Sequence, residues 1–371
     1  MADQKPLSTE EKRELLKKML REKAEKAAAA AQTQGQTGTS TKDFGQFADF
    51  SKFPEVHTLD AQFQTLGMLH VENPYFRVNE TIVNNRTQIG GRDLISFSSY
   101  NYLGLSGDPR VSKAAQEAVQ DYGTSVSASR IATGEKPLHQ QLEQALAKLI
   151  GTEDAITLVS GHATNVTVIG HMMRQGKDLI VYDELSHNCI IEGAVLSGAR
   201  RIAFPHEDWE ALDKILEDNR ADYERVLIAI EGVYSMDGDI ADVPKFIEIK
   251  KKHQALLLVD EAHSMGVIGP NGLGVREHFN IDPNDVDLWM GTFSKSFASC
   301  GGYIAGRHSL VRFLKYNTPG FVYSVGISPA NAAAALATTR IMMEEPWRAH
   351  ACQANSKLFL EGAKARGLDT G

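Results

Sequence analysis

The chain has few cysteines and no segment that would place it at a membrane. Its 371 residues include only Cys189, Cys300 and Cys352, which are scattered and show no metal-binding spacing. That pattern is typical of a reducing compartment, so we expect a cytoplasmic protein without a bound metal. No run of about 20 apolar residues occurs, and the charged N-terminus lacks the apolar stretch of a secretory signal. We therefore expect neither a membrane span nor a signal peptide.

Basic blocks are also missing. The formal net charge is −8, and no cluster of lysine and arginine offsets it, which argues against a general nucleic-acid-binding protein. With 42% hydrophobic and 23% charged residues, the composition is that of an ordinary globular protein. The length allows one or two lobes with a large core.

The N-terminal region predicts a short helix followed by a linker. Residues 8–26 carry a capping-box pattern at Ser8 and Glu11 and then a narrow apolar stripe, which favours an amphipathic helix. Residues 27–45 are rich in Ala, Gln, Gly and Thr and predict a flexible linker. The helix is either a solvated tail or a docking element, and the sequence leaves both open.

Beyond Arg86 the chain alternates between strand and helix patterns. Helices are predicted at Pro137–Ile150 and Pro244–His253, among others. The candidate strands are Ala155–Val159, Leu179–Tyr182, Arg201–Phe204, Val226–Ile230, Ala255–Val259 and Leu288–Gly291. Such alternation predicts an α/β domain whose mostly parallel sheet is covered by helices on both faces. We assign residues 46–95 to an N-terminal segment, 96–340 to this domain, and 341–371 to the start of a smaller C-terminal lobe.

The most informative residue is Lys295, which follows the apolar stretch Leu288–Met290 and is flanked by serines. Upstream, Asp260 closes the strand predicted at Ala255–Val259. Pyridoxal phosphate (PLP) needs such a pair, because a carboxylate keeps its ring nitrogen protonated and an amine binds it covalently. Both residues fall at the carboxyl ends of strands, where ligands bind in parallel sheets. The pair predicts a PLP-dependent enzyme.

The run Asp260–His263 also matches the acidic box of some helicases. That interpretation requires a phosphate loop ending in Gly-Lys-Ser/Thr. The nearest segment, Gly170–Asp178, has the wrong spacing and ends without the hydroxyl residue. We therefore set the helicase interpretation aside.

Other strand ends carry polar residues suited to the same cofactor. Ser160–Asn165 lies where a strand turns into a helix, and free backbone N–H groups there can bind phosphate. A glycine at such a turn is usually only a turn residue, but the hydroxyls of Thr292 and Ser294 strengthen the phosphate interpretation. His187 and Ser235 follow further strand ends, and a lone histidine is more often structural than catalytic. Their ordered recurrence favours one ligand site.

With these motifs the sequence closely resembles the α-oxoamine synthases, a branch of the fold-type I PLP enzymes. This family includes 8-amino-7-oxononanoate synthase, 2-amino-3-ketobutyrate CoA ligase, 5-aminolevulinate synthase and serine palmitoyltransferase. The resemblance covers about residues 95–340. The matching runs are Phe97–Leu105, Ser129–Gly134 with His139, the His187 motif, Glu231–Asp239, Asp260–His263, Gly266–Gly269 and the lysine segment. It implies a mostly parallel, seven-stranded-type sheet with helices on both faces, plus a smaller C-terminal α+β lobe.

The resemblance implies roles for the residues at the cofactor ring. Lys295 would hold PLP covalently and then act as general base, while Asp260 would pair with the ring nitrogen. His263 and Ser235 would contact the ring hydroxyl, and His187 would stack on the ring face.

It also implies how the cofactor phosphate is held. Gly161 and His162 would offer backbone donors to it, joined by the hydroxyls of Thr292 and Ser294. Ser324 would reach the phosphate of the other subunit, which implies a homodimer with shared active sites.

The family chemistry joins a small amino acid to an acyl thioester, usually with loss of carbon dioxide, to give an α-amino ketone. Asn101 would lie near the amino acid. An aminotransferase or lyase on the same fold is the main alternative, since the Asp–Lys pair is common to them. A non-catalytic partner subunit ranks last, because such partners have lost the lysine and Lys295 is present.

Three departures from the family pattern stand out. His162 occupies a position that is usually aromatic, and Gly326 one that usually carries a hydroxyl. The arginine that grips the substrate carboxylate has no match, because neither Arg348 nor Arg366 fits its motif.

Some features resemble synthases that work beside or within polyketide and peptide assembly lines. These are His162 and the runs Leu7–Arg13, Tyr100–Tyr102 and Ala298–Tyr303. We therefore expect an acyl carrier protein to deliver the acyl group, with a coenzyme A thioester as the close rival.

Overall fold

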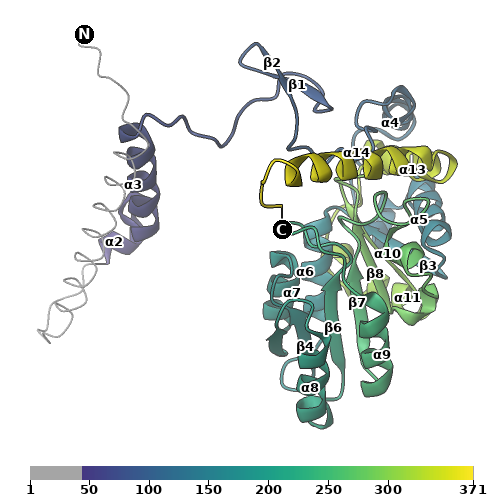
Figure 1. The fold of residues 1–371 in the computed structure, drawn as a ribbon. Coiled ribbons are helices and arrows are strands. Elements are labelled where there is room, and N and C mark those ends of the chain that lie inside the picture. The colour runs from purple at the N-terminus through teal and green to yellow at the C-terminus, as the bar shows by residue number, and fades with distance from the viewer. Residues whose placement is uncertain (1–43, 371) are drawn as a thin grey trace, which may run out of the picture. The chain divides into compact units, whose positions relative to one another are not determined.

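The computed structural model describes residues 44–370 and divides the chain into two units, Met1–Val78 and Asn79–Gly371 (Figure 1). The predicted helix over residues 8–26 and nearly all of the linker lie outside the described residues. Within the described part of the first unit, the helices are α2 (Gly45–Ala48) and α3 (Pro54–Met68), separated by the 3₁₀ turn η2 (Phe50–Lys52). Neither η2 nor α3 has a fully buried residue.

The second unit opens with a β-hairpin that the sequence analysis did not predict. Its strands are β1 (Arg86–Ile89) and β2 (Arg92–Ile95), paired antiparallel. Gly90 and Gly91 form the turn with φ of 59° and 68°, values that favour glycine and match the twist of a tight hairpin. The adjacent Gly-Gly pair was therefore a usable signal.

The core of the second unit is a seven-stranded sheet in the order β3-β9-β8-β7-β6-β4-β5. Its strands are β3 (Asp154–Leu158), β4 (Leu179–Asp183), β5 (Arg200–Phe204), β6 (Val226–Glu231), β7 (Leu256–Asp260), β8 (Leu288–Thr292) and β9 (Gly302–Gly306). Only β9 runs antiparallel to its neighbours. The predicted mostly parallel sheet is confirmed, and all six predicted strands lie within one residue of their observed bounds. β9 was missed because a glycine stands at each of its ends.

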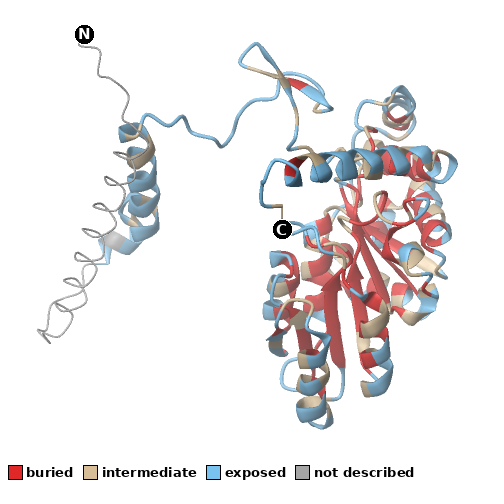
Figure 2. Cartoon of the chain, viewed as in Figure 1, coloured by how far each residue is buried: buried red, intermediate tan, exposed pale blue. Residues whose placement is uncertain are grey.

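Helices cover both faces of this sheet, as predicted. Alternate residues of each strand point to opposite faces, so Ile228 and Leu227 fall in two separate apolar clusters. Helices α5 (Pro137–Ile150), α8 (Trp209–Asn219), α9 (Val243–His253) and α13 (Pro329–Glu344) contribute to the first cluster, and α6 (Gly161–Met172), α7 (Asn188–Ser197) and α11 (His308–Asn317) to the second. The central strands are consequently buried along their length (Figure 2).

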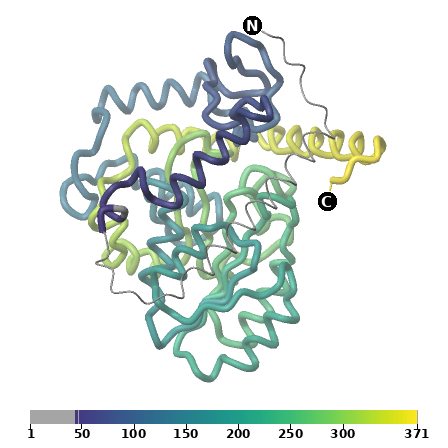
Figure 3. Tube along the Cα trace, turned by 90° about the vertical axis from the view of Figure 1, so that its left-hand side faces the viewer, coloured from purple at the N-terminus to yellow at the C-terminus, as the bar shows by residue number. Residues whose placement is uncertain are grey.

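The remaining helices of this unit are α4 (Pro109–Tyr122), α10 (Gly274–His278), α12 (Pro319–Val322) and α14 (Trp347–Lys364). Near its start α14 packs on the loop after β7, where Gln353 Nε2 donates to the carbonyls of Val267 and Gly269 at 2.7 and 2.9 Å. Its later turns extend past the sheet-bearing body (Figure 3) and expose Leu358 and Phe359. That residues 341–371 begin a second lobe stays a prediction. Among the described helices, none is long and apolar enough to cross a membrane.

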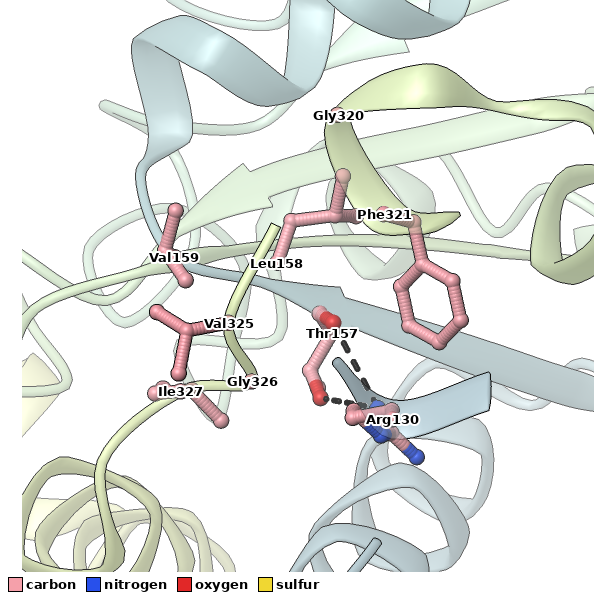
Figure 4. Close-up of a pocket in the computed structure, with 9 residues that line it drawn as sticks. All are labelled: Arg130, Thr157, Leu158, Val159, Gly320, Phe321, Val325, Gly326 and Ile327. Carbon is pink, nitrogen blue, oxygen red and sulfur yellow. Dashed lines mark hydrogen bonds between the residues drawn. The ribbon is translucent and has the colours of Figure 1, made fainter. Parts of the chain in front are cut away.

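A buried ion-pair network ties three distant segments of the second unit together. Arg130 has a side chain only 4% exposed and donates to the carboxylates of Glu135 and Glu143. Its Nη1 also donates to Thr157 Oγ1 at 3.1 Å, and its guanidinium lies 5.1 Å from the ring centre of Phe321 (Figure 4). The network thereby joins the Ser129–Gly134 motif to α5, β3 and α12.

The same network explains one departure from the family pattern. A Cβ added to Gly326 would lie 2.9 Å from Arg130 Cγ and 3.1 Å from a methyl group of Val126. No hydroxyl side chain fits there without displacing the arginine (Figure 4). Gly326 is therefore the residue that this packing requires.

We predict that Arg130→Ala lowers the free energy of unfolding by about 3–5 kcal/mol, because it leaves the buried Glu143 carboxylate with fewer partners. Urea denaturation followed by circular dichroism measures this change. The control is Arg312→Ala at an exposed position, which should cost less than about 0.5 kcal/mol. Equal losses in the two variants would contradict a structural role for the network.

Candidate active site

The carboxyl ends of β3, β4, β6, β7 and β8 gather side chains around one cavity of about 190 Å³. Parallel strands deliver the residues that follow them to the same edge of a sheet, so distant segments meet there. The cavity is lined by Tyr100, Gly161, His162, His187, Cys189, Glu231, Asp260, Ala262, His263, Met290, Thr292, Ser294 and Lys295. Most of the predicted site residues are thus brought together.

Lys295 lies in a hydrogen-bonded chain with His263. Its Nζ is 2.8 Å from His263 Nε2, and the hydroxyl of Tyr102 is 3.0 Å from His263 Nδ1. Burial lowers the pKa of Lys295, and burial together with the lysine charge lowers the pKa of His263 to about 4. The imidazole is therefore neutral near pH 7, and the amine loses its proton more readily than an exposed lysine.

Asp260 is a buried acid with neutral partners only. Its Oδ2 accepts a hydrogen bond from Asn165 Nδ2 at 2.8 Å and its Oδ1 accepts one from the backbone N–H of Ala262 at 2.9 Å. Among the described residues no cation forms an ion pair with it, and burial raises its pKa. An ionised carboxylate in this position calls for a cationic ligand group.

Glu231 stands beside Asp260, because β6 and β7 pair these two residues in register. It is 3% exposed, and its Oε1 accepts the backbone N–H of His187. Burial and the neighbouring Asp260 charge raise the pKa of Glu231 to about 8. Burial and mutual repulsion therefore disfavour two ionised carboxylates side by side at neutral pH.

The start of α6 forms a close cradle with the lysine segment. A Cβ added to Gly161 would lie 2.5 Å from Thr292 Oγ1, so only glycine fits this approach. Thr292 Oγ1 and Ser294 Oγ are 2.9 Å apart, and both residues line the cavity next to the first residues of α6. Hydroxyls beside free N–H groups at a helix start are suited to an anion such as phosphate.

Two histidines and a thiol line another wall of the cavity. His162 and His187 meet edge to face with ring centres 6.2 Å apart. His187 Nδ1 is 2.9 Å from the Sγ of Cys189, whose pKa burial raises to about 12. The thiol is therefore protonated. The His187 ring lines the cavity and is held in place by its contacts with His162 and Cys189.

Three predicted site residues do not line the cavity. Ser235 is exposed in the loop after β6, and the Ser324 hydroxyl donates to the carbonyl of Val325 at 3.2 Å. The Asn101 side chain accepts from Ser106 N within its own turn and donates to Val83 O in the segment before β1. Their predicted roles stay predictions.

Neither arginine named in the sequence analysis faces the cavity. Arg348 pairs with Asp108 and Glu345, and Arg366 donates to the carbonyl of Gly362.

Sequence reasoning missed several residues of the site. Glu231 ends the strand that precedes Ser235, and its position beside Asp260 follows from the strand register, which one sequence does not give. Tyr100 and Tyr102 lie in the matching run Phe97–Leu105. No sequence pattern there predicted the turn that brings their rings close to His263. Asn165, three helical positions after His162, carries the amide that holds Asp260.

The residues present fit PLP. A buried acid whose described hydrogen-bond partners are both neutral lines the cavity together with a lysine of lowered pKa, and a glycine–hydroxyl cradle lies beside them. These elements match a protonated ring nitrogen, a carbonyl and a phosphate, respectively. Within residues 44–370, no group of three or more His, Cys, Asp or Glu side chains could hold a metal ion.

Comparisons with known proteins agree with this chemistry. The profile of the family Aminotransferase class I and II matches residues 92–370. The 8-amino-7-oxononanoate synthase of Thermoanaerobacter pseudethanolicus is 36% identical over 318 residues, covering 85% of this chain and 80% of that one. The corresponding enzyme of Thermosipho melanesiensis is 39% identical over 297 residues, with 80% and 75% covered.

Solved structures give the same picture. Serine palmitoyltransferase from S. paucimobilis, in a structure with bound PLP, superposes with a TM-score of 0.81 and is 32% identical, covering 86% of this chain and 79% of that one. The 8-amino-7-oxononanoate synthase of Francisella tularensis superposes with a TM-score of 0.63 at 25% identity, covering 74% and 76%.

We predict that Glu231→Gln stabilises the cofactor-free chain, and by more at about pH 8 than at about pH 5. The folded-state pKa of Glu231, about 8, lies above the ordinary 4.5, so the parent binds a proton on folding and loses stability as pH rises between these values. Glutamine cannot ionise and avoids this loss. Urea denaturation at both pH values measures the difference, with the exposed Glu210→Gln as control. A gain that does not grow with pH would contradict the raised pKa.

Proposed function

This chain belongs to the aminotransferase class I and II family, within its α-oxoamine synthase group, and we propose that it joins a small amino acid to an acyl group from a thioester. The product is an α-amino ketone, usually formed with loss of carbon dioxide, and the cofactor is PLP. The observation that carries the proposal is the cavity that Lys295 and the buried Asp260 share.

PLP, when bound, withdraws electrons from the amino acid and so supplies the electron sink of the reaction. Lys295 holds the cofactor covalently, and its amine then takes the proton from the amino acid's Cα. The lowered pKa of Lys295 suits this task, because a base works best when its pKa lies near the working pH. Asp260 keeps the ring nitrogen protonated, and Asn165 holds the Asp260 carboxylate in place.

The other predicted residues complete the cofactor site. The backbone of Gly161 and His162 with the hydroxyls of Thr292 and Ser294 binds the phosphate, and His187 stacks on the ring. His263 and Ser235 are proposed to contact the ring hydroxyl.

We also propose a homodimer with shared active sites. Ser324 lies in the segment Tyr323–Val325, whose flanking residues Tyr323 and Val325 are exposed by 85% and 48%. A second copy of the chain would cover them and receive the Ser324 hydroxyl at its phosphate. We also propose that Asn101 lies near the amino acid. Its side chain holds the turn in which it stands.

The proposal is tested by thiol release. We predict that the chain with PLP releases free thiol from an acyl thioester only when glycine, alanine or serine is also present, and that Lys295→Ala abolishes this release. Dithionitrobenzoate measures the thiol, and mass spectrometry measures the amino ketone. Conversion of the cofactor to its amine form by amino acid alone would instead indicate an aminotransferase. Release that survives in Lys295→Ala would contradict the assigned base.

The same assay separates the acyl donors. We propose that an acyl carrier protein delivers the acyl group in the cytoplasm, on the strength of the assembly-line features of the sequence. Deleting residues 1–42 should then lower turnover with acyl carrier protein and leave turnover with acyl-CoA unchanged. Equal turnover of carrier substrate by both chains would show that the N-terminal segment is not a docking element.

A further inference from the structure

A tyrosine, a histidine and the lysine form an unbroken hydrogen-bonded chain at the cavity. The hydroxyl of Tyr102 is 3.0 Å from His263 Nδ1, and His263 Nε2 is 2.8 Å from Lys295 Nζ. Both ring nitrogens of the imidazole are therefore occupied, one on each side. These hydrogen bonds lead from the amine of Lys295 to the half-buried Tyr102.

The turn that carries Tyr102 is fixed by the side chain of Asn101. Asn101 Oδ1 accepts from Ser106 N at 3.0 Å, and its Nδ2 donates to Val83 O at 3.2 Å. Tyr102 N donates to Tyr100 O at 2.8 Å, which closes the turn. The two tyrosine rings consequently approach His263 with ring centres 6.3 Å and 6.4 Å from it.

The hydrogen-bonded row of Tyr102, His263 and Lys295 has two arrangements of its protons. When Lys295 is charged, Nζ donates to Nε2, so the ring proton lies on Nδ1 and is donated to the Tyr102 oxygen. When Lys295 is neutral, the tyrosine O–H donates to Nδ1, and Nε2–H donates to the amine. A neutral imidazole serves in both arrangements, because only its tautomer changes.

We propose that Tyr102, acting through His263, is the proton outlet of Lys295. Nζ gives one proton to Nε2, the Nδ1 proton passes to the tyrosine oxygen, and the original hydroxyl proton leaves to a water or buffer base. One proton leaves the lysine, one enters solvent, and both relay residues end neutral. Tyr102 is thus a positioning residue that sets the tautomer of His263.

This outlet matters whenever Lys295 is a free amine that must be neutral to bond with the cofactor, so the inference rests on the proposed function. Burial lowers the pKa of His263 to about 4 and raises that of Tyr102 to about 12, so neither stays ionised near pH 7. The other titratable groups facing the chain are Asp260, Glu231, His187, Cys189, Tyr100 and Cys352. A pH profile must therefore be compared between variants that keep all of them.

The test is the rate at which cofactor-free protein takes up PLP, followed by stopped-flow absorbance of the lysine-bound cofactor. Tyr102→Phe keeps the ring and removes the hydroxyl. We expect it to load about tenfold more slowly than the parent in dilute buffer at about pH 7, and to recover in concentrated imidazole buffer, which takes the proton directly. The control Tyr316→Phe removes an exposed hydroxyl on α11, outside the cavity, and should keep the parent's buffer response.

A second measurement needs no cofactor. Nitrogen-15 spectra of labelled histidine, assigned with His263→Asn, should show the His263 tautomer responding to pH in the parent and in Tyr316→Phe but altered in Tyr102→Phe. Equal loading rates of parent and Tyr102→Phe in every buffer would overturn the relay. So would a slow rate that imidazole does not restore, since the hydroxyl would then only support the ring. If the parent itself takes up no PLP, the proposed function fails with it.

Discussion

The burial of one carboxylate, Asp260, is the constraint around which the site is built. Its oxygens receive only an amide and a backbone N–H, and its neighbour Glu231 keeps a proton rather than adding a second charge. A buried charge whose hydrogen-bond partners are all neutral is costly, so the site gains stability when a cationic group pairs with it. A protonated ring nitrogen supplies that group. Binding of the cofactor would therefore offset the cost of burying the Asp260 charge.

The other side chains of the site also favour their neutral forms. His263 is held neutral, Cys189 keeps its proton, and Lys295 loses its proton more readily than an exposed lysine. Few side chains in the cavity are therefore ionised before the cofactor binds. Protons can instead move along hydrogen bonds between neutral residues, as in the chain from Lys295 to Tyr102.

How far the sequence predicts this arrangement depends on the range of each interaction. The parallel strands were found because each is a short apolar run, and Lys295 and Asp260 because each directly follows one. Strand β9 and the hairpin lack such runs. Glu231 and Tyr102 were not assigned because their neighbours come from register and from a turn set by the Asn101 side chain. The prediction that Asn101 lies near the amino acid stays a prediction, and no sequence pattern indicated that its amide also holds this turn.

The most direct measurement of the central claim is the site at which PLP attaches. The purified chain is incubated with PLP, reduced with borohydride to make the bond permanent, digested and analysed by mass spectrometry. We expect the added mass on the peptide containing Lys295, and none on folded Lys295→Ala protein. Attachment to a different lysine in preference to Lys295, or no attachment to the folded parent chain, would contradict it.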